Sequence, residues 1–188
     1  MQYLVAGLVL VAGLTTLNLV LTVALVRRWR ARLSAPPAAR PGHLPRDPEP
    51  GIAPGDRMPE FTVTTAGGAR LTRDEFAGRP ALIAFLSLDC PGCDDSVPAF
   101  AEHARRVRDA GGRVMATVVG VDAGGSELAA RLAGVADHVV PEFLDAPVGT
   151  AFGVRFYPTF AHYAPDGVAT AAGVGLQRLA ETARASAQ

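Results

Sequence analysis

The chain of 188 residues has only two cysteines and contains no lysine, so arginine supplies all eighteen of its basic residues apart from histidine. Eighteen acidic residues balance these arginines, and a chain without net charge has no overall field that would attract nucleic acid. Two cysteines cannot form a disulfide scaffold. Without a second cysteine pair, they also cannot supply the four ligands of an all-cysteine zinc site. The two that are present, Cys90 and Cys93, are separated by only two residues.

Charged residues are absent from residues 3–26, a stretch of 24 residues. A helix of this length reaches about 36 Å, enough to cross a hydrocarbon core of about 30 Å. A cleaved signal peptide and a buried core helix are the alternatives. Signal peptides carry basic residues before the apolar run, whereas here Met1 and Gln2 precede it and arginines follow it. We therefore predict an uncleaved transmembrane anchor at 3–26.

Residues 27–56 combine a basic flank with a proline-rich linker. The flank contains Arg27, Arg28, Arg30 and Arg32, and basic residues beside a membrane span favour the cytoplasmic side. Seven prolines lie within residues 33–56, which predicts a stiff tether with polyproline II character. A globular domain is then expected over residues 57–188.

Apolar runs and helical patterns alternate through this domain, which predicts an α/β fold. "LTRDEFAG" offers Thr72 as an N-cap with Glu75 three residues on, the pattern of a capping box. "PDG" (165–167) between two apolar runs predicts a hairpin. The expected strands are 60–65, 81–88, 113–121, 137–141, 159–165 and 167–173, and the expected helices are 91–110, 126–133, 145–152 and 174–187.

Cys90 lies where the buried run 81–88 gives way to the predicted helix. Pro91 suits the first helical turn, where its lack of an N–H costs little. Backbone N–H groups and the helix dipole there favour a thiolate on Cys90. Cys93 is one turn further on, close enough to attack a mixed disulfide at Cys90. We predict a thiol–disulfide exchange pair in which Cys90 is the exposed nucleophile and Cys93 the resolving thiol.

Three other roles for the cysteines are less well supported. The histidines of the domain, at 103, 138 and 162, lack the spacing of zinc ligands. A purely structural disulfide across so short a loop would constrain the unfolded chain little. Two incidental core thiols are the third possibility.

The quoted segments resemble the thioredoxin superfamily. The matching stretches are "PEFTVTTAGGARLTRDEFAGRPALIAFLSLDCPGC" (59–93), "SVP" (96–98) and "VRFYPTF" (154–160). More narrowly, the chain is similar to membrane-anchored TlpA-like and methylamine-utilisation-type thiol–disulfide oxidoreductases, proteins with a redoxin domain. The resemblance implies a thioredoxin-like three-layer α/β fold with a central mixed sheet, preceded by one transmembrane helix. It also implies that Pro158 is a cis-proline facing the cysteines, that Tyr157, Pro158 and Thr159 contact substrate, and that Pro98 kinks the long helix.

Several positions depart from this family pattern. Asp89 stands where related reductases often have an aromatic residue before the first cysteine. Ser96 replaces a frequent glutamate, and Ala84 replaces the buried acid of many thioredoxins. Asp89, Asp94 and Asp95 also surround the pair with negative charge, which opposes a thiolate. Alternatively, these acids complement a helix N-terminus in solvent.

The predicted activity is a dithiol–disulfide cycle that needs no cofactor and no metal, since the two sulfurs carry the electrons. Its partners would be protein thiols or disulfides and a second protein that recharges the pair. A peroxide reductase is the enzymatic alternative: Ser87 suits a peroxidatic site, but Ile83 stands where that site has a proline. A client-binding assembly factor without chemistry is the third reading. We predict a single-pass protein of the cell membrane. The arginine flank favours a domain on the cytoplasmic side, whereas analogy with the anchored relatives favours a domain on the outer side.

Overall fold

The computed structural model describes residues 49–186, together with Gly13, Thr15, Asn18 and Leu19, which have helical backbone conformation. The chain divides into two compact units, 1–46 and 47–188, and the folded domain lies in the second. The predicted anchor at 3–26 falls almost entirely outside the described residues. Among the residues that are described, none of the helices has the length and apolarity needed to span a membrane.

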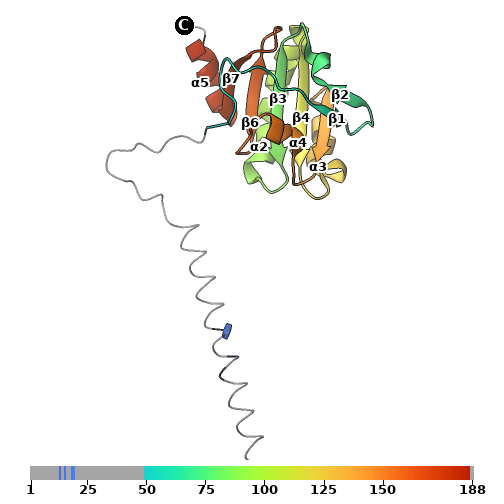
Figure 1. Cartoon of the computed structure of the whole chain (residues 1–188), viewed down its shortest axis with the longest axis vertical. Helices are drawn as coiled ribbons and strands as arrows, with labels where there is room; N and C mark the ends of the chain where they lie inside the picture. Colours follow the sequence, from blue (N-terminus) through green and yellow to red (C-terminus); the bar gives the residue numbers. More distant parts are fainter. Residues whose placement is uncertain (1–12, 14, 16–17, 20–48, 187–188) are drawn as a thin grey trace, which may run out of the picture. The chain divides into compact units, whose positions relative to one another are not determined.

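A five-stranded mixed sheet forms the centre of the domain, in the order β5-β4-β3-β6-β7 (Figure 1). β3 (Ala81–Ser87), β4 (Arg113–Val119) and β5 (His138–Glu142) run parallel to one another. β6 (Thr159–Tyr163) and β7 (Ala169–Val174) complete the sheet as the predicted hairpin, and β6 is antiparallel to β3. All seven residues of β3 are buried, as expected for a central strand covered on both faces.

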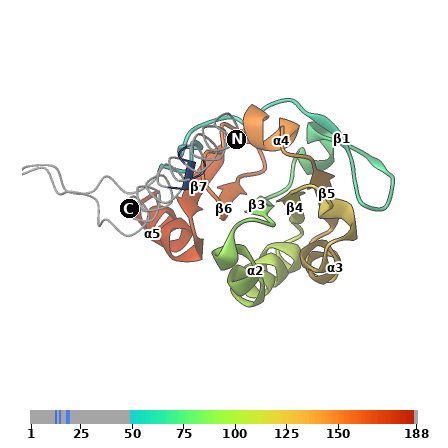
Figure 2. The same ribbon diagram turned by 90° about the horizontal axis from the view of Figure 1, so that it is seen from below.

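Helices cover both faces of this sheet, so the domain has three layers (Figure 2). α2 (Pro91–Asp109), α3 (Glu127–Ala133) and α5 (Leu176–Ser186) contribute to the core on one face. α4 (Pro147–Ala151) and the 3-10 helix η1 (Arg73–Phe76) contribute to the core on the other. A second 3-10 helix, η2 (Ala123–Gly125), leads from β4 into α3.

β1 (Thr62–Thr64), within the strand expected at 60–65, and β2 (Arg70–Thr72), which was not among the expected strands, form a separate two-stranded antiparallel sheet. The predicted capping box that follows is wrong. Thr72 is the residue before η1, but its side chain makes no capping hydrogen bond. A single 3-10 turn leaves fewer free N–H groups to cap than an α-helix does.

The folded unit includes residues that precede the expected boundary at Arg57. Ile52 is buried in the core on the η1 side of the sheet. The N–H of Gly55 donates to the carbonyl of Ala169 at 2.8 Å, and Arg57 forms an isolated bridge to Val168. The last part of the proline-rich stretch therefore packs against the β6–β7 hairpin.

Candidate active site

Both cysteines lie at the junction of β3 and α2, where the sequence predicted them. Cys90 is the N-cap residue of α2, and Pro91 occupies the first helical position. Cys90 is partly exposed, whereas Cys93 is fully buried in the core between the sheet and α2. The prediction of one accessible and one enclosed thiol is therefore confirmed.

Hydrogen bonds and burial set the chemistry of Cys93. Its sulfur accepts a hydrogen bond from the backbone N–H of Ser87 at 3.4 Å. Burial is the main cause that raises the pKa of the Cys93 thiol well above its usual range, followed by a hydrogen bond shared with the side chain of Cys90. The N–H of Ser87 acts in the opposite direction, and the charges of Cys90 and Asp94 add to the increase. Cys93 is therefore held as a neutral thiol in the reduced domain.

The expected capping of the Cys90 sulfur is not present. The backbone N–H of Cys93 donates to the carbonyl of Cys90 at 3.0 Å, but the Cys90 side chain accepts no capping hydrogen bond. The first turn is therefore closed by the backbone, while the partly exposed Cys90 packs against the core cluster that contains Cys93.

The segment before β6 confirms the cis-proline that the family resemblance implied. The peptide bond between Tyr157 and Pro158 is cis, and the N–H of Gly175 donates to the Pro158 carbonyl at 2.9 Å. Tyr157 is half-buried and packs against the cores on both faces of the sheet. Thr159 is fully buried and its hydroxyl donates to the Phe156 carbonyl at 2.7 Å, so it supports this turn from inside. Substrate contact by Tyr157, Pro158 and Thr159 stays a prediction.

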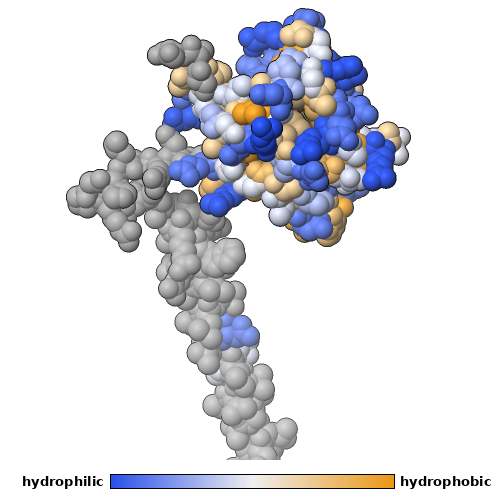
Figure 3. Space-filling view, turned by 45° about the horizontal axis from the view of Figure 1, so that its top comes forward, coloured by the Kyte–Doolittle hydropathy of each residue, from blue (hydrophilic) through white to orange (hydrophobic). Residues whose placement is uncertain are grey.

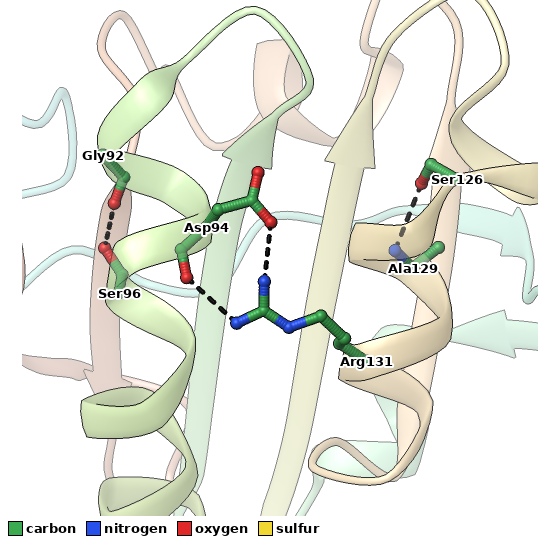
Figure 4. A network of polar contacts seen from close by, with 6 residues as sticks. All are labelled: Gly92, Asp94, Ser96, Ser126, Ala129 and Arg131. Atoms are coloured by element: carbon green, nitrogen blue, oxygen red, sulfur yellow. Dashed lines mark hydrogen bonds and ion pairs between the residues drawn. The ribbon is translucent and has the colours of Figure 1, made fainter.

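One of the three aspartates near the cysteines has a partner within the domain. Arg131 of α3 donates to the carboxylate of Asp94 at 2.9 Å and to its backbone carbonyl at 3.2 Å (Figure 4). Both side chains are exposed, so the pair fixes α3 beside the start of α2 without contributing much stability. Ala84 is fully buried on β3, and no carboxyl group lies there.

A buried carboxyl group that the sequence did not indicate lies on β5. Glu142 is only 5% exposed and accepts hydrogen bonds from the N–H groups of Val148 and Gly149 at 2.6 and 3.4 Å. Burial raises the pKa of Glu142 above its ordinary value, and the two hydrogen bonds oppose this increase. Tyr157 is nearby: burial, and then the charges of Glu142 and Cys93, raise its pKa. The only sequence signal for Glu142 is an acid at the end of an apolar strand.

A shallow groove of about 600 Å³ lies between α2 and the start of α5, and neither cysteine is among its lining residues. Its lining includes Asp95 and Ser96 of α2, together with Gly175 and Leu176. Gly175 is hydrogen-bonded to Pro158, so the groove adjoins the cis-proline turn. No group of three or more His, Cys, Asp or Glu side chains in the described part of the chain could hold a metal ion.

Comparison with models of known protein families assigns the domain to a family. A model described as the AhpC/TSA family matches residues 54–163, more than half of the chain. The chain belongs to the AhpC/TSA family. The match starts before Arg57, as does the folded unit, and ends with β6. A search of curated proteins gave no match for this AhpC/TSA chain.

Solved structures share its fold at low sequence identity. The thioredoxin domain of a thiol-disulfide oxidoreductase from Bacteroides vulgatus aligns with a TM-score of 0.59 and 17% identity, covering 71% of this chain and 97% of that one. A structure named as the thiol:disulfide interchange protein DsbE from Chlorobium tepidum aligns at 0.57 and 21%, covering 73% and 99%. A secreted disulfide oxidoreductase from Mycobacterium tuberculosis aligns at 0.51 and 18%, covering 68% and 94%. These similarities confirm the predicted thioredoxin-like α/β fold.

Proposed function

We propose that this AhpC/TSA domain is a thiol–disulfide oxidoreductase that exchanges electrons with protein dithiols and disulfides through Cys90 and Cys93. One observation carries the proposal: a partly exposed thiol stands at the N-cap position of a helix while its neighbour is buried one turn further on. The cis Tyr157–Pro158 turn and the adjoining groove support it, because they provide a surface on which a substrate backbone can lie.

In the reducing direction, the Cys90 thiolate attacks one sulfur of a substrate disulfide. A Cys90–substrate disulfide forms, the substrate S–S bond breaks, and the departing thiolate takes up a proton. Cys93 then loses its proton and its thiolate attacks the Cys90 sulfur, so that the Cys90–substrate bond breaks and the second substrate thiolate takes up a proton. Two electrons and two protons have passed to the substrate, and the domain holds a Cys90–Cys93 disulfide. A partner dithiol restores the reduced pair; the reverse sequence oxidises a client.

The environment of Cys93 divides the two roles. Its proton is held while Cys90 is a thiolate, because burial and the Cys90 charge both disfavour a second thiolate. A mixed disulfide at Cys90 removes that charge and the hydrogen bond that the thiolate accepts. Two of the causes that raise the Cys93 pKa therefore disappear at the step in which Cys93 must attack.

The test is turnover of a disulfide-linked peptide by the full chain, with dithiothreitol as electron donor. We expect a rate above the uncatalysed one for the parent, no turnover for Cys90→Ser, and an accumulating mixed disulfide for Cys93→Ser. Parallel assays replace the peptide with hydrogen peroxide. Turnover of peroxide alone would identify a peroxide reductase, and an inert parent with accessible thiols would overturn the proposal.

We also propose that residues 3–26 anchor the domain in the cell membrane as a single span. The uncharged stretch of 24 residues followed by arginines supports this. Membrane fractionation with alkaline washing tests the anchor. A topology reporter fused after Gln188 tests on which side of the membrane the domain lies. We expect the protein in the washed membrane fraction; release by the wash would contradict a span.

A further inference from the structure

The large hydrophobic residues exposed on the folded unit gather at one end of the sheet. They are, among the residues described there, Leu88, Val121, Phe143, Leu144 and Phe156. The first four follow the carboxyl ends of β3, β4 and β5, which are parallel, and Phe156 comes shortly before β6, which is antiparallel to β3. All five therefore lie at the same edge, with Val121 at 75% and Phe143 at 58% exposure. On the face drawn in Figure 3, by contrast, hydrophobic residues form small patches among hydrophilic ones.

This edge also carries the candidate active site. Cys90 follows β3 by three residues, and the cis Tyr157–Pro158 turn directly follows Phe156. The side chain of Leu88 lies over Gly120: a Cβ atom on Gly120 would be 2.6 Å from a Leu88 methyl carbon. The apolar residues thus extend from the cysteines across the ends of β4 and β5.

An aspartate follows the apolar residue at each of the three parallel strand ends. The pairs are Leu88-Asp89, Val121-Asp122 and Leu144-Asp145. All three aspartates are exposed, and within residues 49–186 no hydrogen bond or ion pair occupies their carboxylates. β3, β4 and β5 are neighbours in the sheet, with strands roughly 4.8 Å apart, so the three pairs follow the ends of three adjacent strands. We name these eight residues, the five apolar ones and the three aspartates, the apolar–acidic edge.

Other charged residues near this end of the sheet add to the negative charge of the three aspartates. Asp94 and Asp95 lie on the first turns of α2, and of the nearby arginines Arg131 is already bonded to Asp94. Arg155 precedes β6 at this end, and Arg178, which lines the groove with Asp95, is paired with Glu181 at 3.2 Å. Carboxylates therefore outnumber guanidinium groups around the cysteines, and the local field favours a cationic partner.

We propose that the apolar–acidic edge docks client polypeptides whose cysteine is flanked by apolar and basic residues. The inference rests on the proposed function, since it gives the substrate class for the same site. Apolar side chains of the client would cover the exposed Phe143, Leu144 and Val121, and its Arg or Lys side chains would face the aspartates. A second copy of this chain would place acid against acid, and an anionic lipid surface would meet the same repulsion.

Binding is measured apart from chemistry, with fluorescent peptides in which serine replaces cysteine and with the full chain in detergent. Three peptides carry Leu-Arg, Leu-Glu or Ser-Arg flanks around the central serine. Fluorescence anisotropy should give a Kd for the Leu-Arg peptide about tenfold lower than for the other two. The difference between Leu-Arg and Leu-Glu should shrink in 1 M salt, where the screening length falls to about 3 Å.

Paired variants test the assignment to this edge. The double variant Asp122→Asn with Asp145→Asn should bind the Leu-Arg and Leu-Glu peptides equally well. The double variant Phe143→Ser with Leu144→Ser should bind the Leu-Arg and Ser-Arg peptides equally well. Asp109→Asn removes an exposed acid at the end of α2 and should change neither. Equal Kd values for the three peptides, or preferences that survive both paired variants, would overturn the docking proposal.

Two further measurements separate the outcomes. Reduction of a small aromatic disulfide reports the proposed function alone, and both paired variants should keep that rate within twofold of the parent. Failure of this reaction with intact peptide preferences would refute the oxidoreductase and leave the docking surface. The last measurement uses a chain lacking residues 1–46, without detergent, once circular dichroism has shown that it is folded. This chain is mixed with neutral phosphatidylcholine vesicles. If it binds them, and if Phe143→Ser with Leu144→Ser abolishes the binding, the edge is a lipid-binding surface and the docking proposal is overturned.

Discussion

The Cys93 sulfur accepts a hydrogen bond from the backbone N–H of Ser87 at 3.4 Å, which ties the first turn of α2 to the end of β3. This bond, together with full burial, gives Cys93 an environment unlike that of Cys90, although the two are separated by only two residues. Adjacent thiols with different access and different proton affinity can divide an exchange reaction into attack and resolution.

The first prediction concerns the order of alkylation. Limiting iodoacetamide near pH 8 should modify Cys90 more than about tenfold faster than Cys93, because alkylation requires an accessible thiolate. Burial restricts access to Cys93 and raises its pKa. Peptide mass spectrometry gives the ratio, and the same reaction in denaturant should bring it close to one. Equal labelling of the folded protein would contradict the assignment of the roles.

The second prediction concerns the packing of α5 on β7. A Cβ atom on Gly173 would lie 2.4 Å from the backbone nitrogen of Leu179 and 2.7 Å from the carbonyl carbon of Arg178. Gly173→Ala should therefore destabilise the domain by about 2–3 kcal/mol, within the range for overpacked sites. Gly67→Ala is the matched control, since the nearest atom there is 3.9 Å away. Thermal unfolding should give a clearly lower Tm for Gly173→Ala only.

Local pattern was sufficient for the elements that carry the cysteines. The continuous apolar run 81–88 and the helix ended by Gly111 have no strong alternative, and the structure has β3 and α2 there. Residues fixed by tertiary contacts were not predictable in this way. Glu142 is buried because the start of α4 packs against its carboxylate, where the N–H of Val148 donates to it. Ile52 is buried because it lies in one core cluster with residues of the β6–β7 hairpin. Neither burial leaves a periodic pattern in the sequence.

The third prediction concerns His162 on β6. Burial is the main cause that lowers its pKa to about 4 from 6.5, and the charges of His103 and Arg106 on α2 add to it. The unfolded chain therefore binds this proton more readily, so stability is retained above pH 6.5 and lost as the pH falls towards 4. The loss approaches about 3 kcal/mol.

Urea unfolding at several pH values between 4.5 and 7.5 measures this effect, and His162→Gln should flatten the acid side of the profile. The variant has no side-chain group that takes up a proton in this pH range but keeps a polar side chain of similar length. Parallel profiles for the parent and the variant would show that His162 is not the group responsible.

The fourth prediction concerns Glu142, whose folded-state pKa is raised by burial above its ordinary 4.5. The folded domain then holds a proton that the unfolded chain has already released, so this contribution to stability is complete below pH 4.5 and declines as the pH rises through the folded-state pKa. Glu142→Gln keeps an oxygen that can accept from the N–H of Val148 and removes the ionisable group. We expect the variant to lose less stability than the parent between pH 5 and 8 in urea unfolding. Asp145→Asn removes a neighbouring charge that adds to the shift and should give an intermediate profile. If the stability of the parent does not decline between pH 5 and 8, Glu142 ionises in the folded domain at little cost. The two backbone hydrogen bonds would then lower its pKa by at least as much as burial raises it.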